Sequence, residues 1–140
     1  MRILKNILIN CCILFQQTGS YANIEKQTYA SQSKHYTASY LECDQLAIDD
    51  NFRLEDALSC AVKELDSEAV ISPYFFDSGG LSVVVLVQGG HICIHSYPEC
   101  QSCFVDFFAS KQVCDWKRFD ALLQEYLKPK VANIQVVMRD

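Results

Sequence analysis

The sequence lacks features that would place it in several large classes. It has no apolar stretch of roughly 18 residues, the length a membrane-spanning helix needs, so no membrane span is expected. Basic residues are not in excess: 12 lysines and arginines against 17 aspartates and glutamates give a formal net charge of -5. A nucleic-acid partner is therefore not expected, because phosphates require a basic face. Repeats and low-complexity segments are also absent, and 140 residues suit one domain.

The N-terminal residues differ in character from the rest of the chain. Arg2 and Lys5 give a basic start, residues 7–15 are mostly apolar, and small residues close the segment at Ser20 and Ala22. This pattern predicts a Sec-type signal peptide over residues 1–22 and hence an exported or periplasmic protein. The alternative is an N-terminus without a targeting role, in which case the protein is cytoplasmic. A polar linker over residues 23–34 and one domain over residues 35–140 follow.

Cysteine, in contrast, is abundant, with eight in the chain. Two lie within the predicted signal peptide, and an even number would remain after its removal. An exported domain could join these in disulfides, although the pairing cannot be read from sequence. In a reducing compartment the same residues would be small buried hydrophobes. The six are Cys43, Cys60, Cys93, Cys100, Cys103 and Cys114.

Hydrophobic periodicity predicts six strands and two helices. Apolar residues at helical spacing indicate helices over residues 52–65 and 115–127, the first with N-cap candidates in the preceding aspartates. β-Branched or alternating runs indicate the strands. The expected fold class is α+β, a two-layer α/β sandwich with a mostly antiparallel sheet and two helices on one face. The predicted strands span residues 35–43, 69–76, 81–87, 91–97, 103–109 and 131–138.

Groups capable of chemistry gather on the two central strands. Ser82 begins one strand, and His91, Cys93 and His95 alternate along one face of the next. A turn at Gly89-Gly90 joins the strands, so these groups are expected to converge near one end of the hairpin. They could perform acid/base work or bind a metal. Alternatively, they point into a polar interface or to solvent.

A second cysteine pattern is a candidate metal site. Cys100 and Cys103 have the two-residue spacing of a metal knuckle or redox pair, and Cys114 follows. A zinc site would need His91 or His95 as a further ligand, and no second such pair exists. We therefore expect no metal.

The sequence of residues 80–99 allows a more specific functional prediction; it reads GLSVVVLVQGGHICIHSYPE. It resembles the core signature of prokaryotic S-adenosylmethionine decarboxylases, in which a Val-Ser-Gly-Val-Val-Val run precedes Glu-Ser-His and then Ile-His-Thr-Trp-Pro-Glu. Residues 35–44 and 104–111 also resemble family segments. The resemblance runs from about residue 35 to the C-terminus. The residues that keep their places in the central signature are Ser82, His91, Ile94, His95, Pro98 and Glu99.

The resemblance implies a chemistry that this sequence cannot supply in the usual way. Family members make a pyruvoyl cofactor from a serine, whose hydroxyl oxygen attacks the preceding carbonyl before the chain breaks. Gly90 stands at the position of that serine, and Gly89 replaces the preceding glutamate. Ser110 aligns with the family's cysteine, which is thought to protonate the product carbanion. No cofactor is therefore expected here.

The remaining family positions could still bind a ligand. By resemblance, Ser82 and His95 assist processing, and Glu99 bonds to the ribose hydroxyls of a nucleoside such as S-adenosylmethionine. Alternatively, Ser82 and His95 keep a hydrogen bond with no task, and Glu99 is a solvated loop carboxylate. By resemblance, too, the chain forms a homo-oligomer, with the site near the interface.

Three functions stay open at this stage. The first is an S-adenosylmethionine decarboxylase of polyamine synthesis. The second is a catalytically inactive relative that binds a nucleoside or pairs with an active paralogue and tunes it. The third is an exported, disulfide-containing interaction protein that reuses the scaffold. We favour family membership with lost or altered catalysis.

Overall fold

The computed structural model describes residues 32–110 and 115–139. The predicted signal peptide, most of the predicted linker and Cys114 lie outside the described residues, so the structure does not test them. The strands are β1 (Ser33–Leu41), β2 (Val70–Phe75), β3 (Leu81–Val87), β4 (Gly90–Tyr97), β5 (Ser102–Ser110) and β6 (Val131–Arg139). The helices are α2 (Gln45–Asp49), α3 (Asn51–Leu65) and α4 (Trp116–Leu127), with a 3₁₀ turn, η2, at Pro98–Cys100.

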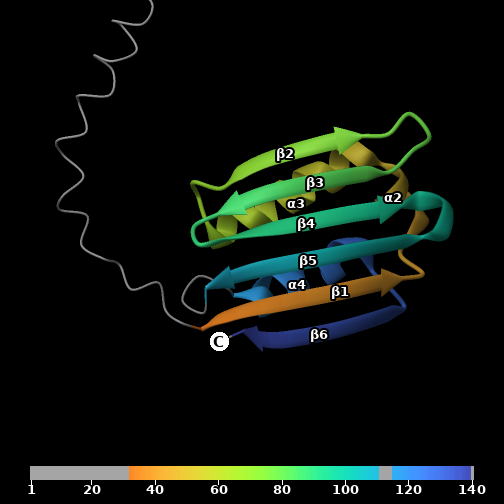
Figure 1. Ribbon diagram of the computed structural model, residues 1–140. Helices are drawn as coiled ribbons and strands as arrows, with labels where there is room; N and C mark the ends of the chain where they lie inside the picture. The colour runs from red at the N-terminus through yellow and green to blue at the C-terminus, as the bar shows by residue number, and fades with distance from the viewer. Residues whose placement is uncertain (1–31, 111–114, 140) are drawn as a thin grey trace, which may run out of the picture.

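The six strands form one sheet in the order β2-β3-β4-β5-β1-β6, and every neighbouring pair is antiparallel. Helices α3 and α4 lie side by side behind the sheet, so one face is covered and the other is free of helices (Figure 1). This confirms the predicted two-layer α+β sandwich. β6 lies at one edge of the sheet and β2 at the other.

Strict alternation along the strands produces the core. In β3, Leu81, Val83 and Val85 are buried, whereas the intervening Ser82, Val84 and Leu86 face the helix-free side. β4 continues the pattern, since Ile92 and Ile94 are buried and His91, Cys93 and His95 are not, as the sequence predicted. The core is completed by the inward side of the helices, whose buried residues are Leu54, Leu58, Ala61, Val62, Phe119, Leu123 and Leu127.

Aspartates begin the helices. The carboxylate of Asp50 accepts a hydrogen bond from Arg53 N at 3.1 Å, and that of Asp115 accepts one from Arg118 N at 3.2 Å. The sequence did not predict α2 or η2, because five and three residues are too few to show helical periodicity. Asp44 caps α2 by accepting from the backbone of Leu46 at 2.9 Å.

A polar cluster lies beneath α4. Tyr36 and Tyr40 of β1 are fully buried, and their hydroxyls donate to Asp120 Oδ1 at 2.8 Å and 2.6 Å. Burial raises the pKa of both tyrosines, so both hydroxyls stay protonated and serve as donors. Gln124 donates to the other carboxylate oxygen at 2.9 Å, which fixes Asp120 as the acceptor between the layers.

Within the described ranges, no helix is long and apolar enough to cross a membrane. The five cysteines there are free thiols, so none of them is joined to another in a disulfide. They are Cys43, Cys60, Cys93, Cys100 and Cys103.

Candidate functional site

Ser82 and His95 form a direct pair on the helix-free face. They are cross-strand partners in β3 and β4, and Ser82 Oγ lies 2.7 Å from His95 Nδ1. Both side chains are half-buried. In the neutral tautomer that carries its proton on Nε2, His95 Nδ1 accepts a hydrogen bond from the Ser82 hydroxyl. In this geometry the imidazole can act as a base and the serine as a hydroxyl donor.

A small pocket opens beside this pair, where β4 leads into η2. It encloses about 150 Å³ and includes Glu99, the residue that the resemblance assigns to ribose binding. The two aromatic side chains that line it, Phe76 and Tyr97, could stack on a planar ring. The full lining is Phe76, Ser78, Gly79, Ser82, Ser96, Tyr97 and Glu99.

Ser96 and Gly80 also shape this pocket, although the sequence predicted a pocket role for neither. Ser96 is buried, and its Oγ accepts a hydrogen bond from Leu81 N at 2.8 Å, which ties the two strands together. Gly80 has φ +92°, and a Cβ there would lie 2.8 Å from the Ser96 carbonyl oxygen. The close approach of the Asp77–Gly80 turn to β4 therefore requires glycine. In the sequence, only the Ser-Gly-Gly run of this turn indicated that a glycine is required there.

Gly90 lies with Ser110 at the other end of β4. Gly90 is the cross-strand partner of Ala109, and Ser110 N donates to the Gly89 carbonyl at 3.3 Å. A Cβ built on Gly90 would collide with the Phe108 carbonyl oxygen and would lie 2.6 Å from Ala109 Cα. The backbone of β5 thus occupies the space that any side chain at Gly90 would need.

The structure does not bring these two groups together. Gly90 and His95 are five residues apart on one extended strand, which places them roughly 16 Å apart at about 3.3 Å per residue. Ser82 and His95 meet at the end of the hairpin opposite the glycine turn, whereas His91 lies near the turn, so the polar groups do not all gather at one end. Antiparallel register imposes this separation.

Between the two groups, the middle of the helix-free face carries a third set of polar side chains. His35 of β1 and Asp106 of β5 are in hydrogen-bond contact, with Nε2 3.2 Å from Oδ1. Cys93 is the cross-strand partner of Asp106. Burial, and then the charge of Asp106, raises the pKa of the Cys93 thiol, which keeps it a weak nucleophile. His35 and Asp106 are 71 residues apart, so no local pattern predicts their contact.

The Cys100–Cys103 spacing does not produce a shared site. Cys100 is exposed, whereas Cys103 is fully buried, so the two thiols do not face a common ligand. Burial raises the pKa of Cys103. Among the residues the structure describes, no group of three or more metal-ligating side chains is placed to hold an ion.

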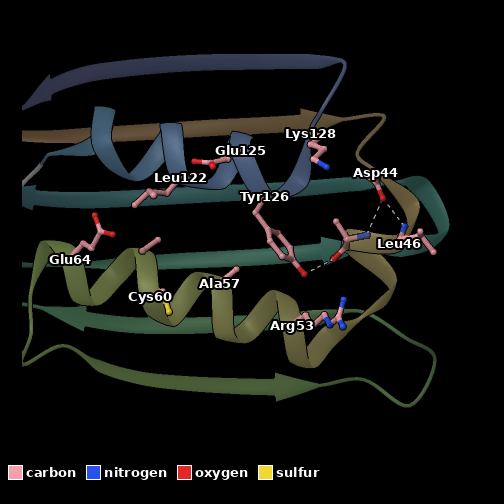
Figure 2. A pocket seen from close by; sticks show the side chains of 12 residues that line it. Asp44, Leu46, Arg53, Ala57, Cys60, Glu64, Leu122, Glu125, Tyr126 and Lys128 are labelled. Atoms are coloured by element: carbon pink, nitrogen blue, oxygen red, sulfur yellow. Dashed lines mark hydrogen bonds between the residues drawn. The ribbon is translucent and has the colours of Figure 1, made fainter.

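A wider groove lies on the opposite, helical side of the molecule. It measures about 640 Å³ and runs between α3 and α4, with Ala57, Cys60 and Leu122 on its walls (Figure 2). Tyr126 of α4 also lines the groove, and its hydroxyl donates to the Ala47 carbonyl at 3.2 Å. The sheet separates this groove from Ser82 and His95, so it is not part of the candidate site.

Comparisons with known proteins show what this chain is similar to. The family described as S-adenosylmethionine decarboxylase matches residues 34–140. The S-adenosylmethionine decarboxylase proenzyme of Thermotoga maritima is 30% identical over 106 residues, which cover 74% of this chain and 81% of that protein. The arginine decarboxylase proenzyme of Aeropyrum pernix is 38% identical over 64 residues, covering 45% of this chain and 48% of that protein.

A solved structure shares the fold as well. The crystal structure of the adenosylmethionine decarboxylase from Aquifex aeolicus VF5 superposes with a TM-score of 0.69 and 27% identity, covering 78% of this chain and 91% of that chain. The family match over residues 34–140 includes both ends of β4 and, apart from Ser33, every residue of the six strands. On the match over residues 34–140 and the shared fold, this chain belongs to the S-adenosylmethionine decarboxylase family.

Proposed function

We propose that this chain is a non-processing member of the family, one that keeps a ligand-binding half-site and has lost the ability to make the pyruvoyl group. The main support for this proposal is Gly90, which supplies no hydroxyl and has β5 in the space that a side chain would need. The residues at this end of β4 do not fit the pyruvoyl group, whose precursor is a serine. The role that remains is binding, as a partner of a second chain.

Neither nearby alternative nucleophile is well suited to replace the serine. Ser96 faces the core, and its hydroxyl is held by the backbone of Leu81. The thiol of Cys93 has a raised pKa and sits beside the carboxylate of Asp106. Both observations support an uncut chain.

The first prediction is that the purified chain has one intact mass, with no break between residues 88 and 96. The physical reason is that Gly90 has no hydroxyl to form the ester, while the Ser96 hydroxyl is held by the backbone of Leu81 and the Cys93 thiol has a raised pKa. Electrospray mass spectrometry of the denatured protein measures this directly. Two fragments that sum to the chain, with the second blocked at its start, would show that processing occurs and would end the proposal.

We also propose, from the predicted signal peptide, that the chain is exported, and the same spectrum tests this. Removal of the predicted signal peptide gives a chain that begins at Asn23, whereas a cytoplasmic protein keeps Arg2 and the residues after it. S-adenosylmethionine is made and used in the cytoplasm, so export would favour an interaction role over a metabolic one. An uncleaved, full-length mass found in the cytoplasmic fraction and not in the periplasmic extract would contradict export.

The binding half-site is incomplete in a single chain, which supports a partner. Its pocket of about 150 Å³ is smaller than the roughly 300 Å³ at which small-molecule sites begin. The helix-free face beside it exposes Val84, Leu86, Tyr97 and Phe104. We infer that a second copy, or a paralogue that retains the serine, covers this face and completes the pocket. A paralogue's serine end would then meet Ser82 and His95 of this chain.

The second prediction is that S-adenosylmethionine binds and that Glu99→Gln weakens binding by about tenfold or more, because hydrogen bonds to a charged acceptor contribute about 1.5–3 kcal/mol. Isothermal titration calorimetry with S-adenosylmethionine measures both affinities, and arginine serves as the competing ligand suggested by the second relative.

Glu68→Gln is the matched control, since Glu68 is an exposed carboxylate outside the pocket. It should leave the affinity unchanged. Equal affinities for wild type and Glu99→Gln would remove Glu99 from the site. Binding of neither ligand would leave the chain as a protein-interaction module.

A further inference from the structure

The outer edge of β6 presents an unusual surface. β6 is nine residues long and, among the described residues, pairs only with β1, so no described strand meets the backbone groups on its other side. All nine residues are exposed. Five large hydrophobic side chains are 37% to 54% exposed, namely Val131, Ile134, Val136, Val137 and Met138.

β6 also lacks the devices that usually keep an edge strand single. It contains no proline, no residue with positive φ and no charge between residues 131 and 138. The opposite edge, β2, is only six residues long and carries Pro73 in its middle. One edge of the sheet is therefore blocked against pairing, and the other is open.

The charges at the ends of β6 do not oppose self-association. Lys130 is paired with Glu42, whose carboxylate lies 3.1 Å away. The guanidinium of Arg139 lies 5.2 Å from the centre of the Phe108 ring, on the helix-free face. Both cations are thus engaged within their own chain, and the strand between them is neutral.

We propose that β6 pairs antiparallel with β6 of a second copy of this chain and joins the two sheets into one. Pairing about Gln135 sets Ile134 of one copy beside Val136 of the other. Both residues share the helix side of the sheet with their β1 partners, Ala38 and Tyr36. An uncharged strand with apolar residues at symmetric positions is complementary to itself. This edge is separate from the helix-free face, so the two interfaces can coexist.

The test uses two double variants of the whole chain, Ile134→Lys with Val136→Lys, and Ile134→Glu with Val136→Glu. In the paired assembly, each introduces like charges directly opposite one another, which is destabilising. Sedimentation velocity should show the assembly mass of each double variant reduced twofold from wild type. Mixing the two variants should restore the wild-type mass, because opposite charges then face each other.

Val70→Lys on the β2 edge is the matched control and should leave the mass unchanged, since Val70 is 62% exposed on the blocked edge. Restoration on mixing also shows that both variants are folded. A wild-type mass retained by both double variants, or a monomeric wild type, would overturn the proposal. Val84→Lys probes the helix-free face separately, so loss of one interface is distinguished from loss of the other.

Discussion

Gly90→Ser is expected to destabilise the domain by about 3 kcal/mol and to give no cleaved chain. The variant restores the hydroxyl that the family's chemistry requires, but its Cβ falls on the backbone of β5, 2.6 Å from Ala109 Cα and 2.8 Å from Ala109 Cβ. Backbone atoms cannot rotate away as a side chain does, so β4 and β5 must separate locally. Thermal unfolding followed by circular dichroism should show a melting temperature lower by on the order of 10 °C.

Gln88→Ser is the matched control. It places the same side chain two residues earlier in the same turn, at an exposed position, and should change stability by about 0.5 kcal/mol or less. The mass of both variants should stay that of the uncut chain. A stable Gly90→Ser protein that breaks before residue 90 would mean that β5 yields readily, and that the missing oxygen alone separates this chain from its processing relatives.

The clash at Gly90 illustrates what the sequence could and could not predict. Periodicity predicted all six strands and both long helices, because alternation in β3 and β4 and helical spacing in α3 are local patterns. The resemblance placed Gly90 at the serine position. That β5 fills the space beside it depends on the path of a strand almost twenty residues away, which no local pattern encodes.

The geometry of the site shows the same limit. Ser82 and His95 were named by resemblance, and their 2.7 Å contact follows from the β3–β4 register. The same register separates them from Gly90, because positions five residues apart on a strand cannot meet. Register could have been counted from the two-residue turn. The glycines of the turn mark where the strands join, but they do not show where the side chains lie.

Asp120→Ala should be the most destabilising of the single substitutions considered, at about 3–5 kcal/mol. Two buried tyrosine hydroxyls donate to one oxygen of this carboxylate, and each hydrogen bond to a charged acceptor contributes about 1.5–3 kcal/mol. Without Asp120, the hydroxyls of Tyr36 and Tyr40 keep only each other, at 2.7 Å, and one donor is left unpaired. Urea unfolding should show the loss as a lower midpoint.

Asp115→Ala is the control on the same helix, since Asp115 only caps the first turn and its loss should cost about 1 kcal/mol.

The pH dependence of stability separates the buried cluster from a general loss of packing. Burial raises the pKa of both tyrosines from 10.0, so the folded state holds their protons more tightly than the unfolded state does. The contribution of these tyrosines to the free energy of unfolding is therefore fully present below pH 10. It falls as the pH rises beyond 10, because only the tyrosines of the unfolded chain ionise there. Replacing both Tyr36 and Tyr40 with phenylalanine should flatten that alkaline fall. An equally steep fall in the double variant would show that the sensitivity arises elsewhere, and that the cluster is not where the two layers are locked together.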